Sequence, residues 1–177
     1  MHHCTVQNPL KFEIDETASS AGLPSPGDLS LSQAICCTPS FSAYPEPNGF
    51  FQTKHLFKKM DKDSVTTFYD SACGLPVFRA PLGRSFSEFE KDTEVHGWPA
   101  FRGKEIVEEN VVVGEGGDVF SGCGTKLGTM ETDEEGIRAC IDLVCIAGVE
   151  GEGVRRRGGG KEREERGERQ RGAGEVH

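Results

Sequence analysis

The chain has 177 residues, of which 35% are hydrophobic, and a formal net charge of −9. This length is enough for one domain with its own core plus flanking segments. The acidic balance gives no support to nucleic-acid binding, and no apolar run approaches the roughly 20 residues that a membrane span needs. Met1 to Cys4 lacks a basic stretch followed by an apolar one, so we expect no signal peptide.

The seven cysteines are odd in number and irregularly spaced. This pattern argues against a secreted disulfide framework and leaves room for a reactive thiol. We therefore expect a protein of the reducing cytosol, that is, a cytoplasmic protein. Cys36 and Cys37 are adjacent, and neighbouring cysteines rarely bridge each other, so we interpret them as incidental or packed thiols.

Composition divides the chain into three parts. Residues 1–49 carry much Ser, Pro, Gly and Ala with little periodicity, which predicts a poorly ordered N-terminal segment. The folded domain is expected over residues 50–149. Residues 150–177 hold eight basic and seven acidic residues among many glycines. This composition predicts a disordered charged tail, with RNA contact or a short helix over residues 162–169 as alternatives.

The first half of the domain predicts a hairpin and a helix. Residues 64–69 and 75–79 are rich in β-forming residues, and Gly74 between them suits an unusual backbone angle. Ser85 with Glu88 three residues later is the capping-box pattern, so a helix is expected within residues 81–97.

Trp98 is the only tryptophan and lies in residues 97–101, where the expected helix ends. Pro99 follows it and makes the turn stiff. From residue type alone, Trp98 is either a core anchor or part of a binding site.

The second half predicts further strands. Residues 105–113 and 119–123 should pair across a turn at residues 114–118, followed by a glycine-flanked loop at residues 124–128. That loop lacks the spacing of a phosphate loop. Residues 135–148 form the longest apolar run, rich in β-branched residues, and predict one buried strand.

In an extended strand Arg138, Cys140 and Asp142 share one face, because residues two apart point the same way. Such a polar triplet is costly to bury without partners. It is therefore either the floor of a site or a satisfied structural pair, since an isolated thiol is often only a small buried hydrophobe.

Four segments, taken in order, match the motifs of one family. Tyr69-Asp-Ser-Ala-Cys-Gly-Leu-Pro-Val-Phe78 is similar to Tyr-x-Cys-x-x-Cys-Gly-x-Pro-Leu-Phe, and Gly97-Trp-Pro-Ala-Phe101 to Gly-Trp-Pro-Ser-Phe. Cys123-Gly-Thr-Lys-Leu-Gly128 is similar to Cys-x-x-His-Leu-Gly-His, and Gly136-Ile-Arg-Ala-Cys-Ile-Asp142 to Gly-x-Arg-Tyr-Cys-Ile-Asn. Over roughly residues 50–149 the chain thus resembles the methionine-R-sulfoxide reductase family, the MsrB or SelR domain.

The resemblance implies a mainly β fold of two antiparallel sheets, of the β-tent-like MsrB type, with a few short helices. It implies reduction of the R-epimer of methionine sulfoxide, free or in proteins, to methionine. An external thiol reductant such as thioredoxin restores the enzyme. The alternative is a catalytically inactive binding module on the same fold.

Carried over by the resemblance, Cys140 is the nucleophile and Arg138 helps to position groups and favours the thiolate. Trp98 lines the pocket for the substrate methyl group, and Phe101 and Thr129 join it in substrate binding. Attack on the sulfoxide leaves Cys140 as a sulfenic acid, which a second thiol must reduce.

The family's two motif histidines, which assist protonation, fall at Lys126 and Thr129. We expect Lys126 to donate the proton in their place. The tyrosine before the nucleophile is Ala139, and the asparagine after it is Asp142, whose carboxylate raises a thiol pKa and opposes Arg138. Weak or altered activity is therefore expected.

Many family members hold structural zinc with two Cys-x-x-Cys pairs, of which this chain keeps Cys73 and Cys123. The other two positions fall at Asp70 and Phe120, and phenylalanine cannot ligate a metal, so we expect no zinc or other cofactor. The resemblance still implies that Cys73 and Cys123 are spatial neighbours.

No intramolecular resolving thiol is expected. The family position just before Gly-Trp-Pro is His96 here. Cys145 is excluded if residues 135–148 are one strand, because five extended residues span about 16 Å and a disulfide needs Cα atoms within about 7 Å. A sulfenic acid at Cys140 should therefore be reduced directly by an external thiol.

Overall fold

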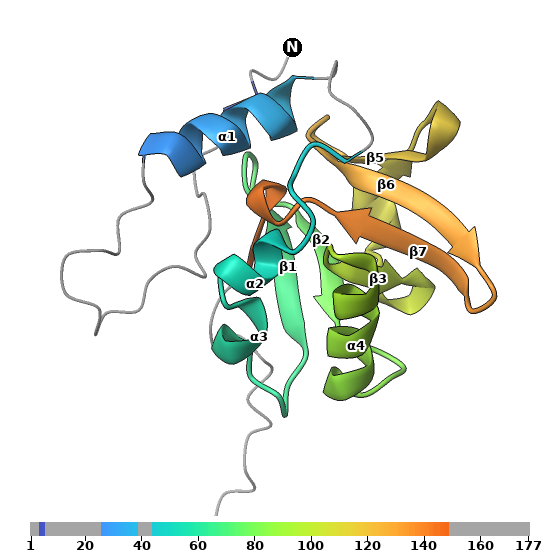
Figure 1. The fold of residues 1–177 in the computed structure, drawn as a ribbon. Coiled ribbons are helices and arrows are strands. Elements are labelled where there is room, and N and C mark those ends of the chain that lie inside the picture. Colours follow the sequence, from blue (N-terminus) through green and yellow to red (C-terminus); the bar gives the residue numbers. More distant parts are fainter. Residues whose placement is uncertain (1–3, 6–25, 39–43, 149–177) are drawn as a thin grey trace, which may run out of the picture.

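A computed structural model describes residues 4–5, 26–38 and 44–148 (Figure 1). The predicted C-terminal tail and most of the predicted N-terminal segment lie outside the described residues. The described chain is mainly β, with two antiparallel sheets and a few short helices, as the fold class predicted. Among the described residues, none of the helices is long and apolar enough to cross a membrane.

The smaller sheet has three strands in the order β2-β1-β8. The predicted hairpin is confirmed: β1 (Thr66–Asp70) pairs antiparallel with β2 (Pro76–Ala80), and Gly74 in the turn has φ of +76°. On its other side β1 pairs with β8 (Ile146–Gly148).

The larger sheet has five strands in the order β3-β7-β6-β5-β4, and every neighbouring pair is antiparallel. Its strands are β3 (Ala100–Arg102), β4 (Val111–Val113), β5 (Asp118–Ser121), β6 (Lys126–Asp133) and β7 (Gly136–Ile141). Short 3-10 turns connect them or lead out of them: η2 (Gly103–Glu105), η3 (Glu108–Asn110), η4 (Glu115–Gly117) and η5 (Leu143–Cys145).

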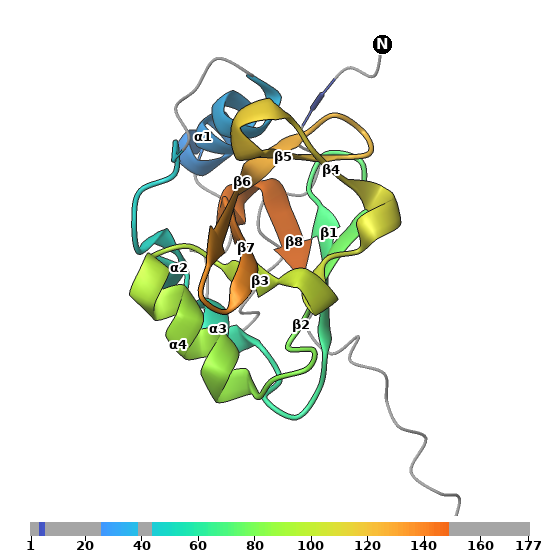
Figure 2. The same cartoon turned by 90° about the vertical axis from the view of Figure 1, so that its right-hand side faces the viewer.

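The predicted helix is α4 (Phe86–His96), and its capping box is confirmed. Ser85 accepts from the Glu88 backbone N–H, and the Glu88 side chain accepts from that of Ser85. The other helices are α1 (Pro26–Cys37), α2 (Phe50–Thr53) and α3 (Leu56–Lys59). Both cartoon views place α1 at the opposite end of the domain from α4 (Figures 1 and 2).

The prediction that residues 135–148 form one strand is wrong. The chain leaves the larger sheet after Ile141, turns through η5 and enters the smaller sheet at Ile146. The Cys145 N–H donates to the Asp142 carbonyl and closes this turn. Residues of the run are apolar because they pass between the two sheets, and Leu143, Val144 and Cys145 are fully buried.

Two other strand assignments need correction. Residues 124–128 are not a loop throughout, because β6 begins at Lys126. A Cβ on Gly128 would lie 2.1 Å from the Cys140 carbonyl oxygen, so this glycine permits close approach of β6 to β7. Residues 105–113 hold the 3-10 turn η3, and only the last three residues are a strand.

Both sheets and α4 pack against one hydrophobic core. Phe101 stacks on Phe78 with ring centroids 4.3 Å apart and meets Phe68 and Phe89 at 5.1 and 5.5 Å. Each of these four rings is completely buried. This aromatic cluster holds β3 and β7 firmly, since β3 carries Phe101 and pairs with β7 along its length.

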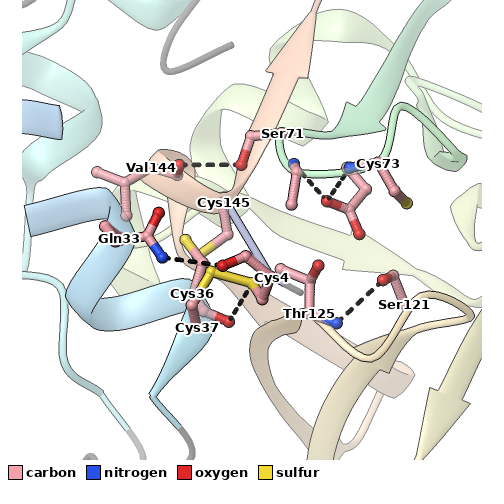
Figure 3. Close-up of a disulfide and its surroundings, with 12 residues drawn as sticks. Cys4, Gln33, Cys36, Cys37, Ser71, Cys73, Ser121, Thr125, Val144 and Cys145 are labelled. Atoms are coloured by element: carbon pink, nitrogen blue, oxygen red, sulfur yellow. Dashed lines mark hydrogen bonds between the residues drawn. A yellow bond between two sulfur atoms is a disulfide. The ribbon is translucent and has the colours of Figure 1, made fainter. Parts of the chain in front are cut away.

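Six of the seven cysteines form disulfides, contrary to the expectation from their odd count. The pairs are Cys4–Cys37, Cys36–Cys145 and Cys73–Cys123, with Cα atoms 5.4, 5.5 and 6.6 Å apart. The predicted proximity of Cys73 and Cys123 is confirmed. Figure 3 shows the other two disulfides together where α1 meets η5. Such bonds are typical of oxidising compartments, while cytoplasmic localisation stays a prediction.

These bonds correct two further expectations. Cys36 and Cys37 are not incidental, because each ties α1 to another part of the chain. The strand argument that excluded Cys145 as a partner of Cys140 loses its basis, because Cys145 lies in η5. In this structure Cys145 is instead bonded to Cys36.

Candidate active site around Cys140

Cys140 is the one cysteine of the described residues that is not in a disulfide. The prediction that Arg138 shares its strand face is confirmed, because Arg138 Nε donates to Cys140 Sγ at 3.4 Å. Cys140 is only 4% exposed. This burial raises the pKa of the Cys140 thiol above its ordinary value, although the hydrogen bond and charge of Arg138 act in the opposite direction.

The guanidinium of Arg138 is also bound to two carboxylates. Glu131, directly opposite Arg138 on β6, accepts from Nη2 at 2.6 Å, and Asp133 pairs with Nη1. Because its charge is shared with these carboxylates, Arg138 stabilises a Cys140 thiolate less than an unpaired arginine would.

A segment that the sequence placed in the poorly ordered N-terminal part lies across this region. We call residues 44–49 the strap. The Tyr44 hydroxyl donates to Glu131, and its ring packs on Trp98 with centroids 4.6 Å apart. The Trp98 Nε1–H donates to the Glu46 carbonyl at 3.0 Å. Glu131 thereby joins the strap to Arg138 and through it to Cys140.

Trp98 lies two residues before β3, which pairs with β7, the strand that carries Cys140. The Ile141 N–H donates to the Pro99 carbonyl at 3.0 Å, and Ala100 stands opposite Cys140. Trp98 is partly exposed. Its indole therefore lies between the segment that leads into β3 and the strap.

The other predicted site residues divide between two faces. Thr129 stands directly opposite Cys140 on β6 and is buried. Lys126 is also buried, and its Nζ lies 3.5 Å from Asp118. Phe101, in contrast, points into the aromatic core, because it pairs with Ala139 and so lies on the face opposite Cys140. Phe101 therefore lies in the core, on the other face of the sheet from the Cys140 thiol.

Asp142 forms an unusual pair with Glu46 of the strap. The Glu46 carboxyl accepts from the N–H of Val144, two residues after Asp142, at 2.9 Å. Burial raises the pKa of Glu46 to about 8, assisted by the charge of Asp142. Burial likewise raises the pKa of Asp142 to about 7, against the effects of the Glu46 N–H and of Lys126.

The residual metal positions lie at the turn of the hairpin. Ligand atoms of Asp70, Cys73 and Cys123 all lie within 4.8 Å of one another. The two sulfurs are joined in a disulfide, and one Asp70 oxygen accepts from the N–H groups of Ala72 and Cys73. A disulfide has no thiolate to offer a metal, so these residues do not fit a zinc site in this oxidation state.

An open cleft of about 690 Å³ lies beside the site, on the side of α4. Ion pairs connect it to the thiol, because Asp92 binds Arg102, Arg102 binds Asp133, and Asp133 binds Arg138. Its lining is mainly charged: Arg84, Glu88, Lys91, Asp92, Val95, His96, Arg102, Asp133, Glu134 and Glu135.

Neither the known protein-family models nor the curated proteins include a match to this chain.

Three residues of the site were missed in the sequence. Tyr44 and Glu46 lie in a stretch whose prolines indicated a loop, and Glu131 lies in a strand whose start was taken for a loop. One signal was available for Glu46, which stands between Pro45 and Pro47. Two prolines restrict the backbone on either side of it, as a fixed anchor requires.

Proposed function

We propose that the chain is a diverged methionine-R-sulfoxide reductase of the MsrB or SelR type, with Cys140 as the nucleophile. The observation that carries the proposal is the state of the cysteines. Cys140 alone stays a thiol among the described cysteines and accepts a hydrogen bond from Arg138. A thiol required for chemistry must be kept out of disulfides, and a neighbouring cation favours its reactive thiolate.

In the proposed reaction the Cys140 thiolate attacks the sulfur of the sulfoxide. The oxygen passes to Cys140 with one proton, which leaves methionine and a sulfenic acid. An external thiol such as that of thioredoxin then reduces the sulfenic acid and releases water. Burial of the Cys140 thiol favours its neutral form, and so do the carboxylates bound to Arg138. We therefore expect turnover to be slow.

Substrate access needs a movement of Tyr44, the first residue of the strap. Cys140 is nearly closed off from solvent, and Tyr44 packs on the face of Trp98. Tyr44 is 36% exposed and can swing outward without disturbing the core. Its departure leaves the indole free to receive the small apolar methyl group of the sulfoxide.

The alternative is a binding module that retains the pocket and has lost turnover. Two observations favour it: Lys126, where a proton donor was predicted, is bound to Asp118, and the pKa of Cys140 is raised. In this case Trp98 and the strap would bind a thioether or sulfoxide without consuming it.

A coupled assay distinguishes the two functions. NADPH consumption is followed with thioredoxin and its reductase, using R- and S-methionine sulfoxide separately. The reductase proposal predicts a rate with the R-epimer that disappears in Cys140→Ser. Saturable binding of the R-epimer without any rate, unchanged in Cys140→Ser, would support the binding module and refute the reductase.

A further inference from the structure

Tyr44 contacts the candidate site in the way that a small bound molecule does. Its ring packs on the indole of Trp98, with centroids 4.6 Å apart and planes tilted by 35°. Its hydroxyl donates to one oxygen of Glu131, and the other oxygen of that carboxylate accepts from Arg138 at 2.6 Å. One side chain of the strap thus occupies both an apolar surface and a hydrogen-bond acceptor of the site.

Three successive hydrogen bonds join the Tyr44 hydroxyl to the thiol. Tyr44 donates to Glu131, Arg138 Nη2 donates to Glu131, and Arg138 Nε donates to Cys140 Sγ at 3.4 Å. In the β6–β7 pair Glu131 stands opposite Arg138 and Thr129 stands opposite Cys140, so these four side chains lie on one face of the larger sheet. Arg138, Thr129 and Cys140 are all buried. Tyr44 therefore contacts the sheet on the face that carries the thiol.

Tyr44 can leave this position while the rest of the strap stays in place. The Glu46 side chain is buried and accepts from the Val144 N–H at 2.9 Å, and the Glu46 carbonyl accepts from the Trp98 indole N–H at 3.0 Å. Tyr44 itself is at the exposed end of the strap. Its release breaks the hydrogen bond to Glu131 and the ring contact, and both anchors of Glu46 remain.

A cover over the thiol accounts for the oxidation state of Cys140. The other six cysteines of the chain are joined in disulfides, and Cys140 alone is a thiol. An accessible thiolate attacks disulfides and is oxidised by small oxidants, and both reactions require contact with the sulfur. A thiol that is closed off from solvent escapes both reactions.

We propose that Tyr44 is a built-in occupant of the site formed by Trp98 and Glu131, that it shields Cys140, and that a ligand reaches Cys140 by displacing it. The class of ligand follows from what Tyr44 supplies, which is an apolar group for the indole and a hydrogen-bond donor for Glu131. Methionine sulfoxide carries both, because its methyl group is apolar and its amino group, or the backbone N–H in a peptide, is a donor. This choice of ligand rests on the proposed reductase function, whereas the shielding of Cys140 does not.

The first test measures access to Cys140 in the absence of ligand. The full chain with its disulfides intact is treated with iodoacetamide, and alkylation of Cys140 is followed by peptide mapping. Tyr44→Phe keeps the ring and loses the hydrogen bond to a charged group, which should raise the alkylation rate by about 10-fold. Tyr44→Ala also loses the ring and should raise the rate further. Glu94→Gln, exposed on α4, is the control and should keep the wild-type rate.

Two results of this test would overturn the shielding. One is an equal alkylation rate in the wild type, Tyr44→Phe and Tyr44→Ala. The other is a rate increase no larger than the loss of global stability in urea accounts for, because the thiol would then be reached by unfolding and not by release of Tyr44.

The second test returns the missing ring to Tyr44→Ala as a separate molecule. Phenol should bind where the Tyr44 ring was and slow the alkylation of Cys140 toward the wild-type rate. Trp98 is the only tryptophan, so its fluorescence reports the same binding. Benzene has no hydroxyl to donate to Glu131 and should protect less than phenol. Failure of phenol to protect Cys140 in Tyr44→Ala would refute the assignment of Tyr44 as an occupant of this site.

The third test measures ligand binding by Trp98 fluorescence in Cys140→Ser, with and without Tyr44→Ala. Removal of the occupant should tighten the binding of R-methionine sulfoxide by about 10-fold, because no ring has to be displaced. Dimethyl sulfoxide, which has no donor for Glu131, should bind weakly to both proteins. The N-acetyl amide of R-methionine sulfoxide distinguishes the donors: equal binding assigns the backbone N–H, and binding of the free amino acid alone assigns the amino group.

These outcomes separate the occupant from the function. Equal affinity for R-methionine sulfoxide with and without Tyr44 would refute displacement, whatever the rate of reduction. If Tyr44→Ala exposes Cys140 and phenol protects it while neither sulfoxide binds, the shielding stands, and the choice of ligand fails together with the proposed reductase.

Discussion

Replacement of Glu46 by glutamine should stabilise the protein, and the gain should grow with pH. The native pKa of Glu46 is raised from 4.5 to about 8. Between these values the native state binds more protons than the unfolded state, so stability falls as pH rises. This carboxyl is therefore a stability cost above pH 8, and below about pH 4.5 the cost is absent.

The magnitude follows from the size of this difference. At about 1.36 kcal/mol per pH unit, a pKa raised from 4.5 to about 8 corresponds to about 5 kcal/mol at pH 9. At pH 5 the same relation leaves less than about 1 kcal/mol. The value at pH 9 is an upper limit, because Asp142 titrates together with Glu46. Glutamine keeps the oxygen that accepts from Val144 and adds an N–H for Asp142.

Urea unfolding at pH 5, 7 and 9, with the disulfides intact, measures the effect. Glu46→Gln should exceed wild type by several kcal/mol at pH 9 and by little at pH 5. Glu94→Gln, exposed on α4, should show no such trend. An equal difference between Glu46→Gln and wild type at pH 5 and pH 9 would refute the buried carboxyl pair.

Other predictions concern the framework of the site. Thiol titration of denatured, unreduced protein should find one thiol per chain, from Cys140; three or more would contradict the disulfide pattern. Cys145→Ser opens a bond that spans 109 residues and should lower the free energy of unfolding by about 2 to 5 kcal/mol in urea. Phe101→Ala should cost about 3 to 5 kcal/mol in the same assay, since its ring is core; a loss of activity without a loss of stability would instead favour a role in substrate binding. Gly128→Ala should force β6 from β7 and destabilise by about 1 to 3 kcal/mol by thermal unfolding.

Local signals in the sequence were sufficient for the local elements. The β1–β2 hairpin depends on a glycine with positive φ at residue 74, and α4 begins at a capping box, and each needs only a few neighbouring residues. The shared face of Arg138 and Cys140 also follows from strand alternation alone. Features of this kind can be predicted from a short stretch of the sequence.

Features that depend on distant partners could not be found in this way. Hydrophobic pattern alone does not distinguish one long strand from two short strands joined by a buried turn, so the break after Ile141 was missed. Glu46 is hydrogen-bonded to Val144 across 98 positions, and Cys36 is bonded to Cys145 across 109. No local rule connects residues so far apart, and the strap therefore looked like an ordinary proline-containing loop.

A single-turnover experiment tests the central claim most directly. Protein with its disulfides intact and no reductant is mixed with excess R-methionine sulfoxide, and methionine is quantified together with the oxidation state of each cysteine by peptide mapping. We predict up to one methionine per chain, a sulfenic acid at Cys140 and no dominant disulfide from Cys140 to Cys145, with no product in Cys140→Ser. Methionine formed equally by Cys140→Ser, or none formed by the wild type, would contradict the assignment of Cys140 as the nucleophile.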